Sequence, residues 1–243
     1  MIALLCSVQA EANLLLSTIT VTGALQLGAK SIIMGNLAGR EISLCVGGMG
    51  KVNAAHAATL LLTHASSEAL IVFGIGGAYR SSGAIVGDLA LAQEEVAGDE
   101  GVLTPDGFKD TTYIGIPLLK TATSMIYHTF PASKMLTEQA QRSLSSRQVE
   151  AGSRLHMGTF ITLSTCTGTS ARAEELEARY HGLCENMEGA AAAQVAASHT
   201  VPWMEVRGIS NLVGDRNLKT WDIPRAAQAA QNAVIQILEG WQQ

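Results

Sequence analysis

The sequence is poor in charged residues and has no cluster of basic ones. Only 15% of its 243 residues are Asp, Glu, Lys or Arg, and the formal net charge is −5. Proteins that bind nucleic acid or an anionic membrane surface use clustered Lys and Arg against phosphates. The composition therefore argues against nucleic acid and membrane lipid as main partners.

The cysteines lack the spacing of a metal site or a disulfide framework. Cys6, Cys45, Cys166 and Cys184 form no C-x-x-C pair and do not cluster with the six histidines. Closely spaced Cys and His would indicate zinc, and a dense even set in a short secreted chain would indicate disulfides. We therefore expect no metal and a reduced, cytoplasmic location.

Long hydrophobic runs are also missing. No stretch reaches the ~18 uninterrupted apolar residues of a membrane span. The opening MIALLCSVQA resembles a signal peptide only in its hydrophobicity, because the first basic residue is Lys30 and Glu11 follows at once. We interpret it as a buried first strand.

Apolar residues make up 47% of the sequence, and 24 residues are glycine. Short apolar runs alternate with helical patterns. This order predicts one α/β domain over residues 1–243: a three-layer α/β/α sandwich around a mixed, mostly parallel twisted sheet. Expected strands are 2–6, 42–46, 70–73, 88–92, 156–163 and 203–209. Expected helices are 10–17, 52–63, 171–180, one beginning near 188, and 224–241. Residues 98–117 carry Gly, Pro and Asp without period and predict a long excursion from the sheet.

Two glycine-rich stretches, 47–52 (GGMGKV) and 74–79 (GIGGAY), are predicted as turns. Neither fits a nucleotide fingerprint, because Tyr79 and Asn53 stand where a third glycine is needed, and Val52 stands where a P-loop has Ser or Thr. The glycines still allow backbone N–H groups to approach a ligand. Ligand contact and simple turn chemistry both remain open.

Two glutamates and one arginine occupy positions that need an explanation. Glu188 precedes Ala191, Ala192 and Val195 at helical spacing, which predicts that it faces inward, although a helix dipole alone could favour an acid there. Arg207 interrupts an otherwise buried strand, and a buried guanidinium needs an anionic partner, for which Glu188 is a candidate.

Further candidates lie at the ends of predicted strands. Glu11 follows the first strand, where it either points to a ligand or begins a helix. Ser210 and Asn211 are expected to end the last strand, at the edge where α/β sheets contact ligands, although Asn211 alone would suit a turn.

Taken together, these residues resemble the purine nucleoside phosphorylase and nucleosidase superfamily. The shared motifs are Glu11, GKVNAA at 50–55, GD at 87–88, NMEGAA at 186–191 and RGIS at 207–210. Within it the chain is similar to nucleosidases that cleave methylthioadenosine and S-adenosylhomocysteine, and more so to the futalosine hydrolase family. The motifs for the latter are GGAYRSSG at 76–83, GDEGV at 98–102, and ISNxVGxR at 209–216 with Trp221.

The resemblance implies hydrolysis of an N-glycosidic bond through an oxocarbenium-like ribosyl centre, without a cofactor. It implies that Glu11 activates the water and Arg207 helps to hold it. Glu188 binds the ribose hydroxyls and Met187 packs on the sugar. The remaining substrate-binding residues that it implies are Phe160, stacked on the base, Ile161 at the base edge, Gly76, Gly77, Val102 and Ser210.

Two departures refine this expectation. Phosphorylases of the superfamily bind phosphate with an arginine and a serine where this chain has Val72 and Ile75, and an apolar lining would leave a phosphate dianion unpaired. Hydrolysis is therefore favoured. Asn211 replaces the aspartate of adenine-specific nucleosidases, and an amide can donate to the two acceptors, N7 and O6, of hypoxanthine. Futalosine, which carries hypoxanthine, is the expected substrate.

The benzoate of futalosine needs a cationic or amide partner, and Arg80 and Arg216 are candidates, although either could be an ordinary surface arginine. A methylthioadenosine, S-adenosylhomocysteine or aminodeoxyfutalosine nucleosidase is the main alternative. A nucleoside-binding module is disfavoured because both acidic residues are present, and a Rossmann oxidoreductase is disfavoured by the failed fingerprints. The resemblance alone implies a homo-oligomer.

Overall fold

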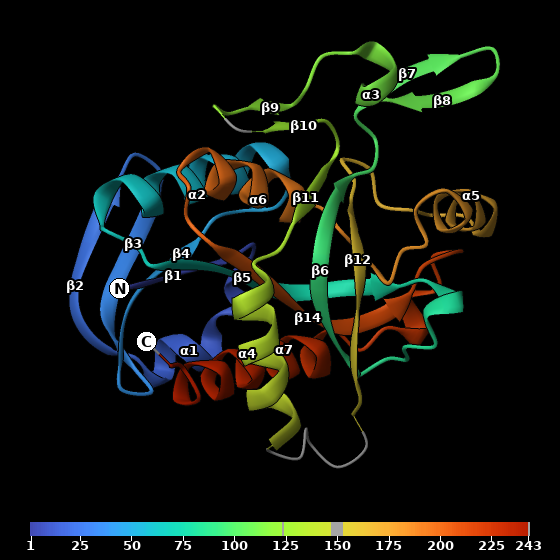
Figure 1. Ribbon diagram of the computed structural model, residues 1–243. Coiled ribbons are helices and arrows are strands. Elements are labelled where there is room, and N and C mark those ends of the chain that lie inside the picture. The colour runs from blue at the N-terminus through green and yellow to red at the C-terminus, as the bar shows by residue number, and fades with distance from the viewer. Residues whose placement is uncertain (123, 147–152, 243) are drawn as a thin grey trace.

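A mixed β-sheet runs through the middle of the structure, a computed structural model that describes residues 1–122, 124–146 and 153–242 (Figure 1). Its strands are β1 (Ile2–Cys6), β2 (Thr20–Leu27), β3 (Lys30–Leu37), β4 (Arg40–Val46), β5 (Ala69–Ala78), β6 (Leu89–Ala97), β11 (Thr129–Pro131), β12 (Leu155–Thr162), β13 (Cys184–Asn186) and β14 (Trp203–Leu212). Two small ribbons stand apart, β7 (Gly101–Thr104) with β8 (Gly107–Asp110), and β9 (Leu119–Lys120) with β10 (Met125–Ile126).

Helices cover both faces of this sheet. They are α1 (Asn13–Thr18), α2 (Lys51–His64), α3 (Thr111–Ile114), α4 (Lys134–Ser146), α5 (Ser170–Tyr180), α6 (Gly189–Ser198) and α7 (Ile223–Glu239). In Figure 1, α2 and α6 lie above the sheet, and α1, α4 and α7 lie below it. The predicted three-layer arrangement is confirmed.

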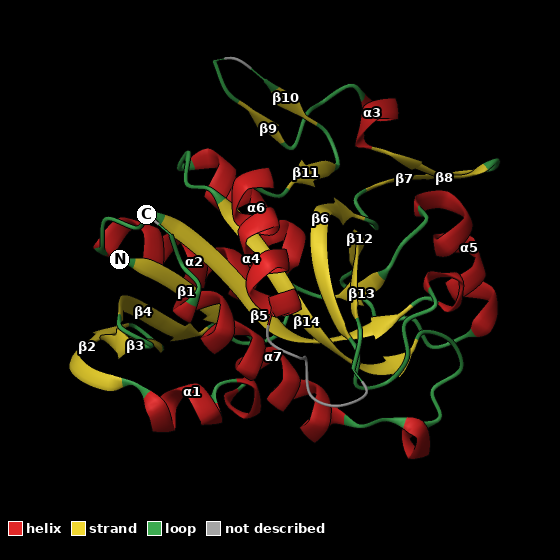
Figure 2. Cartoon of the chain, turned by 60° about the horizontal axis from the view of Figure 1, so that its bottom comes forward, coloured by secondary structure: helices red, strands yellow, loops and turns green. Residues whose placement is uncertain are grey.

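The sheet closes on itself at one end. β14 pairs in parallel with β5 and antiparallel with β6, while β5 continues through β13 and β12 back to β6. Five strands thus form a ring, and Figure 2 shows them curving around one another. On the open side, β1 lies between β4 and β5 and is parallel to both, whereas β2 and β3 pair antiparallel. The predicted mixed sheet is confirmed, but its closure was not predicted.

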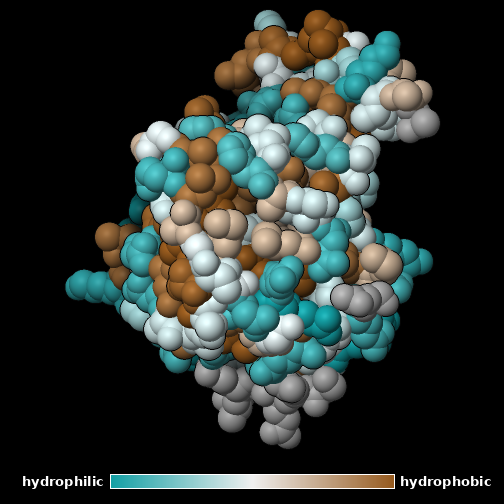
Figure 3. All heavy atoms as spheres, turned by 90° about the vertical axis from the view of Figure 1, so that its left-hand side faces the viewer, coloured by the Kyte–Doolittle hydropathy of each residue, from teal (hydrophilic) through white to brown (hydrophobic). Residues whose placement is uncertain are grey.

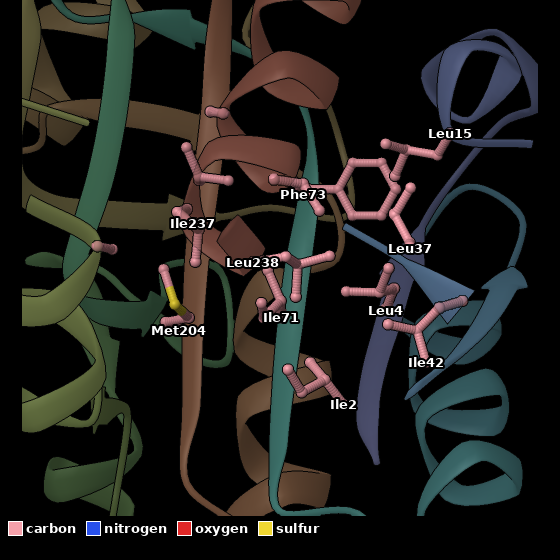
Figure 4. Packing of buried hydrophobic residues seen from close by; sticks show 14 of the residues in the cluster. Ile2, Leu4, Leu15, Leu37, Ile42, Ile71, Phe73, Met204, Ile237 and Leu238 are labelled. Carbon is pink, nitrogen blue, oxygen red and sulfur yellow. The ribbon is translucent and has the colours of Figure 1, made fainter. Parts of the chain in front are cut away.

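Successive residues of β1 point into two different cores. Ile2 and Leu4 pack with Ile71, Phe73 and Met204 against α7, as Figure 4 shows (Figure 4). Ala3 and Leu5 pack on the opposite face with α2 and α6. A strand buried on both faces has no polar side to expose, which explains its continuous apolar sequence.

The second glycine-rich stretch is not the turn that the sequence suggested. β5 continues through Gly74 to Ala78, well past Val72, where its pairing with β1 ends. The extension is stable because β13 and β14 supply hydrogen-bonding partners on its two sides. Tertiary pairing has overridden the turn preference of glycine here. Ser210 and Asn211 lie at the end of β14, as expected, although the strand runs one residue further, to Leu212.

The helix after Glu188 differs from the prediction in its phase. Glu188 is the N-cap of α6, outside the helical stripe, and Ala192, Ala193 and Ala196 form its buried side. Ala191 and Val195 are only half-buried. Glu188 nevertheless points inward, because its position before the helix, rather than helical spacing, places it there.

The excursion predicted for residues 98–117 is present and extends, over the described residues, to Ile126; it projects from the body at the top of Figure 1 and carries α3 and both ribbons. Figure 3 shows hydrophobic side chains, in brown, at the top of the molecule (Figure 3). Large apolar side chains exposed on this projection are Leu103, Tyr113, Ile114, Ile116 and Met125.

Candidate active site

A cavity of about 280 Å³ opens beside the second half of β5, close to the lower end of the ~300–1,000 Å³ usual for small-molecule sites. The loop after β1, the loop after β4, the start of α6 and the end of β14 meet there. Its lining is Ser7, Val8, Glu11, Met49, Ile75, Gly76, Gly77, Cys166, Thr167, Glu185, Asn186, Met187, Glu188, Arg207, Ser210, Asn211, Val213, Arg216 and Trp221.

Glu11 is fixed by backbone donors from the loop after β1 and from β5. It closes a 3₁₀ turn (Gln9–Glu11) just after β1 and is only 3% exposed. Its Oε2 accepts from the N–H groups of Ser7 at 2.9 Å and Val8 at 3.1 Å, and its Oε1 accepts from Ile75 N–H at 2.8 Å. A carboxylate with three charge-assisted bonds is held in one orientation. Lone pairs remain for one further donor, such as water.

Gly74 makes room for this carboxylate. A methyl group on Gly74 would overlap Oε1 of Glu11 and would lie 3.1 Å from Nη1 of Arg207. The glycine is therefore required by the close approach of two functional side chains, which the sequence alone could not distinguish from a turn.

Glu188 bridges the loop after β4 and the buried arginine. Its Oε1 accepts from Gly50 N–H at 2.8 Å, and its Oε2 lies 3.4 Å from both Nη1 and Nη2 of Arg207. The side chain lines the cavity, although the residue is only 6% exposed. The predicted partnership of Glu188 with Arg207 is confirmed.

Arg207 has a second and closer anionic partner, Glu205, with Nε donating to Oε1 at 2.6 Å. Burial would lower the pKa of the Arg207 guanidinium, but the charges of Glu205, Glu188 and Glu11 outweigh it, so the pKa is raised. Nη1 also donates to the Ile75 carbonyl at 3.0 Å. Arg207 is therefore permanently charged and its plane is fixed.

β13 runs antiparallel beside the end of β5 and brings Glu185 level with Gly77. A methyl group on Gly76 would overlap the Cys184 sulfur, and one on Gly77 would lie 2.9 Å from Val213 and 3.0 Å from Nδ2 of Asn211. Both glycines thus line the cavity at a close approach of strands, as candidate contacts for a ligand.

Asn211 is oriented by its neighbours at one end of the cavity. Ser210 Oγ donates to Asn211 Oδ1 at 2.8 Å, and Asn211 Nδ2 donates to the Leu212 carbonyl at 3.1 Å. An amide nitrogen carries two hydrogens. In this arrangement one N–H of Asn211 is left for a ligand.

Sequence reasoning missed a third carboxylate of the cavity, Glu185. It accepts from Thr167 N–H at 2.8 Å, Thr167 Oγ1 at 2.5 Å and the Tyr79 hydroxyl at 2.9 Å. Burial, and next the Glu185 charge, raise the pKa of Tyr79, so this phenol stays a donor. The available signal was a glutamate only three residues before Glu188 in a segment that had to be buried.

Other predicted residues fall into two groups. Met187 lines the cavity with its sulfur 3.2 Å from that of Cys166, and Arg216 lines it with its guanidinium 4.8 Å from the Trp221 ring centre. Phe160, Ile161, Val102 and Arg80 are not among the described residues that line it.

Those four residues lie in other environments. Phe160 and Ile161 on β12 are fully buried, Phe160 among core residues such as Ala78 and Leu183. Val102 is half-buried on β7, and Arg80 is exposed at a separate hollow beside α5. Phe160 is therefore enclosed by core residues and is not part of the cavity lining, and the base-stacking role that the resemblance implies stays a prediction.

Within the described residues there is no group of three or more His, Cys, Asp or Glu arranged to hold a metal ion. No helix over the described ranges is both long and apolar enough to cross a membrane.

Comparison with known proteins agrees with this geometry. The model of the phosphorylase superfamily matches residues 1–239, and the chain belongs to that superfamily. A futalosine hydrolase from Streptomyces coelicolor is 36% identical over 178 residues, 72% of this chain and 68% of that protein. One from Thermus thermophilus is 32% identical over 194 residues, 79% and 78% of the two chains.

A solved structure shares the fold. The 5'-methylthioadenosine/S-adenosylhomocysteine nucleosidase of Neisseria meningitidis, in complex with methylthio-immucillin-A, superposes with a TM-score of 0.84 at 23% identity, covering 99% of each chain.

Proposed function

We propose that this chain is an N-glycosyl hydrolase that cleaves futalosine to hypoxanthine and dehypoxanthine futalosine, in menaquinone biosynthesis. The observation that carries the proposal is the arrangement of Glu11, Arg207 and Glu188 around one cavity, in a chain 36% identical to a futalosine hydrolase. The substrate partners are this purine nucleoside and water.

The proposed reaction uses each of the three groups once. The bond between the base and the anomeric carbon breaks, the electron pair leaves with the base, and the base takes up one proton from solvent, which balances the proton that Glu11 accepts and later returns to solvent. Glu11 accepts a proton from the water whose oxygen forms the new bond to the anomeric carbon. Glu188 accepts from the ribose hydroxyls, and its charge stabilises the positive charge of the ribosyl transition state more than the neutral ground state. Arg207 holds Glu188 and contacts the water.

Hydrolysis rather than phosphorolysis is supported by the two positions that distinguish phosphorylases. Val72 is 1% exposed and packs in the core toward α2 and α6, so it offers nothing to the cavity. Ile75 lines the cavity with an apolar side chain and uses its N–H for Glu11. A phosphate dianion would find no charged partner at either position.

The test is hypoxanthine release from futalosine by the purified protein in phosphate-free buffer, with methylthioadenosine and inosine in parallel. We expect rapid release from futalosine. Adenine release from methylthioadenosine would instead establish the alternative nucleosidase, and activity that appears only with added phosphate would refute hydrolysis.

Base selectivity should change with Asn211→Asp. The remaining N–H of Asn211 suits the acceptors N7 and O6 of hypoxanthine, whereas a protonated aspartate can donate to N7 and accept from the adenine amino group. A mismatched buried pair costs about 1–3 kcal/mol, so the hypoxanthine-to-adenine ratio of kcat/KM should fall by roughly 5- to 150-fold. Paired assays of futalosine and its 6-amino analogue measure it. Asn13→Asp, at an exposed position on α1, is the matched control, and equal ratios in both variants would refute the role.

We further propose that Arg216, rather than Arg80, binds the benzoate, since only Arg216 lines the cavity. Arg216→Ala should raise KM for futalosine by about two- to fivefold, the range of an exposed ion pair, without changing KM for inosine, which has no benzoate. Arg80→Ala is the control and should change neither value. An unchanged KM for futalosine in Arg216→Ala would remove the assignment.

We also propose a cytoplasmic homo-oligomer. The four cysteines are free, which suits a reducing compartment. The apolar side chains exposed on residues 98–126 suit burial against a second copy. Light scattering of the purified protein measures the assembly, and a monomer at micromolar concentration would contradict it.

A further inference from the structure

Two more glutamates lie behind the candidate site, out of contact with the cavity. Glu95 on β6 and Glu205 on β14 are both 0% exposed. They meet beneath Gly189, the first residue of α6, where an added methyl group would overlap Oε1 of Glu95 and Oε2 of Glu205. Two adjacent buried carboxylates cannot both be ionised without a large repulsion.

The contacts of each carboxyl show which one carries the charge. Glu205 Oε1 accepts from Arg207 Nε at 2.6 Å, so the guanidinium stabilises an ionised Glu205. Glu95 has only neutral donors, Asn186 Nδ2 at 2.5 Å and Thr162 Oγ1 at 2.7 Å. Burial, and next the charge of Glu205, raise the pKa of Glu95 well above its ordinary value.

One buried atom supports the same assignment. Glu205 Oε2 has no hydrogen-bond donor among the described residues. A buried carboxylate oxygen without a donor is costly. If Glu95 carries a proton, its O–H reaches this oxygen and no acceptor is left unmatched.

The pair connects to both sides of the reaction site. Through Glu205 it fixes the Arg207 plane, whose other edge holds Glu188. Through Glu95 it fixes Asn186, whose Oδ1 accepts from the backbone N–H of Glu188 at 3.0 Å and of Gly189 at 2.8 Å. The side chain and the backbone of Glu188 are thus positioned by the same two carboxyls.

We propose that Glu95 and Glu205 share a single proton and act as one positioning unit that fixes Arg207 and Glu188 for the reaction. The positioning role rests on the proposed function, whereas the shared proton does not. The shared proton leaves the pair with one negative charge, and that charge balances the positive charge of Arg207. The guanidinium therefore does not neutralise the charges of Glu11 and Glu188.

Infrared spectroscopy tests the proton directly. The wild type at neutral pH should show the carbonyl band of a buried, protonated carboxylic acid, and Glu95→Gln should lack it. Glu94→Gln is the matched control, because Glu94 is the neighbouring carboxylate on β6 and its side-chain partner among the described residues is Thr159, at 2.8 Å; it should keep the band. If the difference between the wild-type and Glu95→Gln spectra lacks this band, the shared proton is refuted. This outcome does not depend on which substrate the protein cleaves.

Kinetics test the positioning role with the nucleoside that the wild type cleaves. Glu205→Gln removes the charge beside Arg207 and should lower kcat by about 10²-fold, as a misplaced catalytic group does. In Glu95→Gln the side-chain NH₂ can still donate to Glu205, and only the hydrogen bond from Asn186 is lost. Its kcat should therefore fall about two- to tenfold. Glu95→Ala should be worse than Glu95→Gln. Equal kcat values in Glu205→Gln and Glu94→Gln would overturn the positioning role. If Glu205→Gln does not fold, the two Glu95 variants decide, and a kcat of Glu95→Ala that is no lower than that of Glu95→Gln would overturn the role.

Discussion

Replacing Glu11 by glutamine should lower kcat for futalosine hydrolysis by roughly 10²- to 10⁴-fold, the usual contribution of a general base. Glutamine fills the same space, but its one oxygen can accept either from Ser7 and Val8 N–H or from Ile75 N–H, and it cannot take a proton from water at neutral pH. Because the proposed role of Glu11 is to act on water, KM should change little. Steady-state kinetics with a thermal unfolding control measure both parameters.

The three backbone donors around Glu11 provide a stronger test of the same role. In Glu11→Ala the N–H groups of Ser7, Val8 and Ile75 remain, and together they form a site for a small carboxylate. Added formate should therefore restore part of the activity of Glu11→Ala and none of the activity of Glu11→Gln, whose amide occupies the site. Activity within tenfold of the wild type in Glu11→Gln would contradict the general-base role.

Much of the arrangement of the fold follows from the apolar pattern. Segments 2–6, 70–73 and 203–209 were predicted as strands covered on both faces, and β1, β5 and β14 are such strands. β2 and β3 were missed because most of β2 is exposed and carries no continuous apolar run. The extension of β5 was missed because glycine favours turns, and only its pairing with β13 and β14 keeps it extended.

The site could be predicted where a charged side chain occurs in an otherwise apolar, buried segment. Arg207 in a buried strand required an anion, and Glu188 provides it at 3.4 Å. Glu205, two residues before Arg207 in the same strand, was not predicted, although it makes the shorter contact, at 2.6 Å. Glu95 could not be found at all, since its meeting with Glu205 depends on the closure of the sheet through β6 and β14.

The charge balance of the site explains its chemistry. Glu11, Glu188 and Glu185 line the cavity, and Arg207 is the only buried cation among its described lining. With Glu205 already compensating Arg207, the cavity keeps an excess of negative charge. In the proposed reaction that excess would stabilise the ribosyl group only when it becomes positive, which is the requirement for lowering the barrier rather than merely binding the substrate.

Glu188→Gln should therefore lower kcat by roughly 10²- to 10³-fold, the loss seen when one preorganised electrostatic partner of a transition state is removed. Glutamine cannot satisfy both neighbours of Glu188. If its oxygen faces Gly50 N–H, its NH₂ faces the donors of Arg207, and if it turns over, its NH₂ faces Gly50 N–H. Unlike Glu11→Gln, this variant should also raise KM, because the proposed role of Glu188 includes contact with the ribose.

Substrates that lack a ribose hydroxyl separate this role from a general loss of structure. If Glu188 accepts from the ribose, the 2'- and 3'-deoxy analogues should each lose activity with the wild type, and at least one should lose much less with Glu188→Gln, since the bond is already absent. The same analogues tested on Glu11→Gln should lose as much as with the wild type, because the two groups act on different reactants. Equal losses for both deoxy analogues in the wild type and Glu188→Gln would mean that Glu188 only holds Arg207 and the start of α6, and that the ribose lies elsewhere in the cavity.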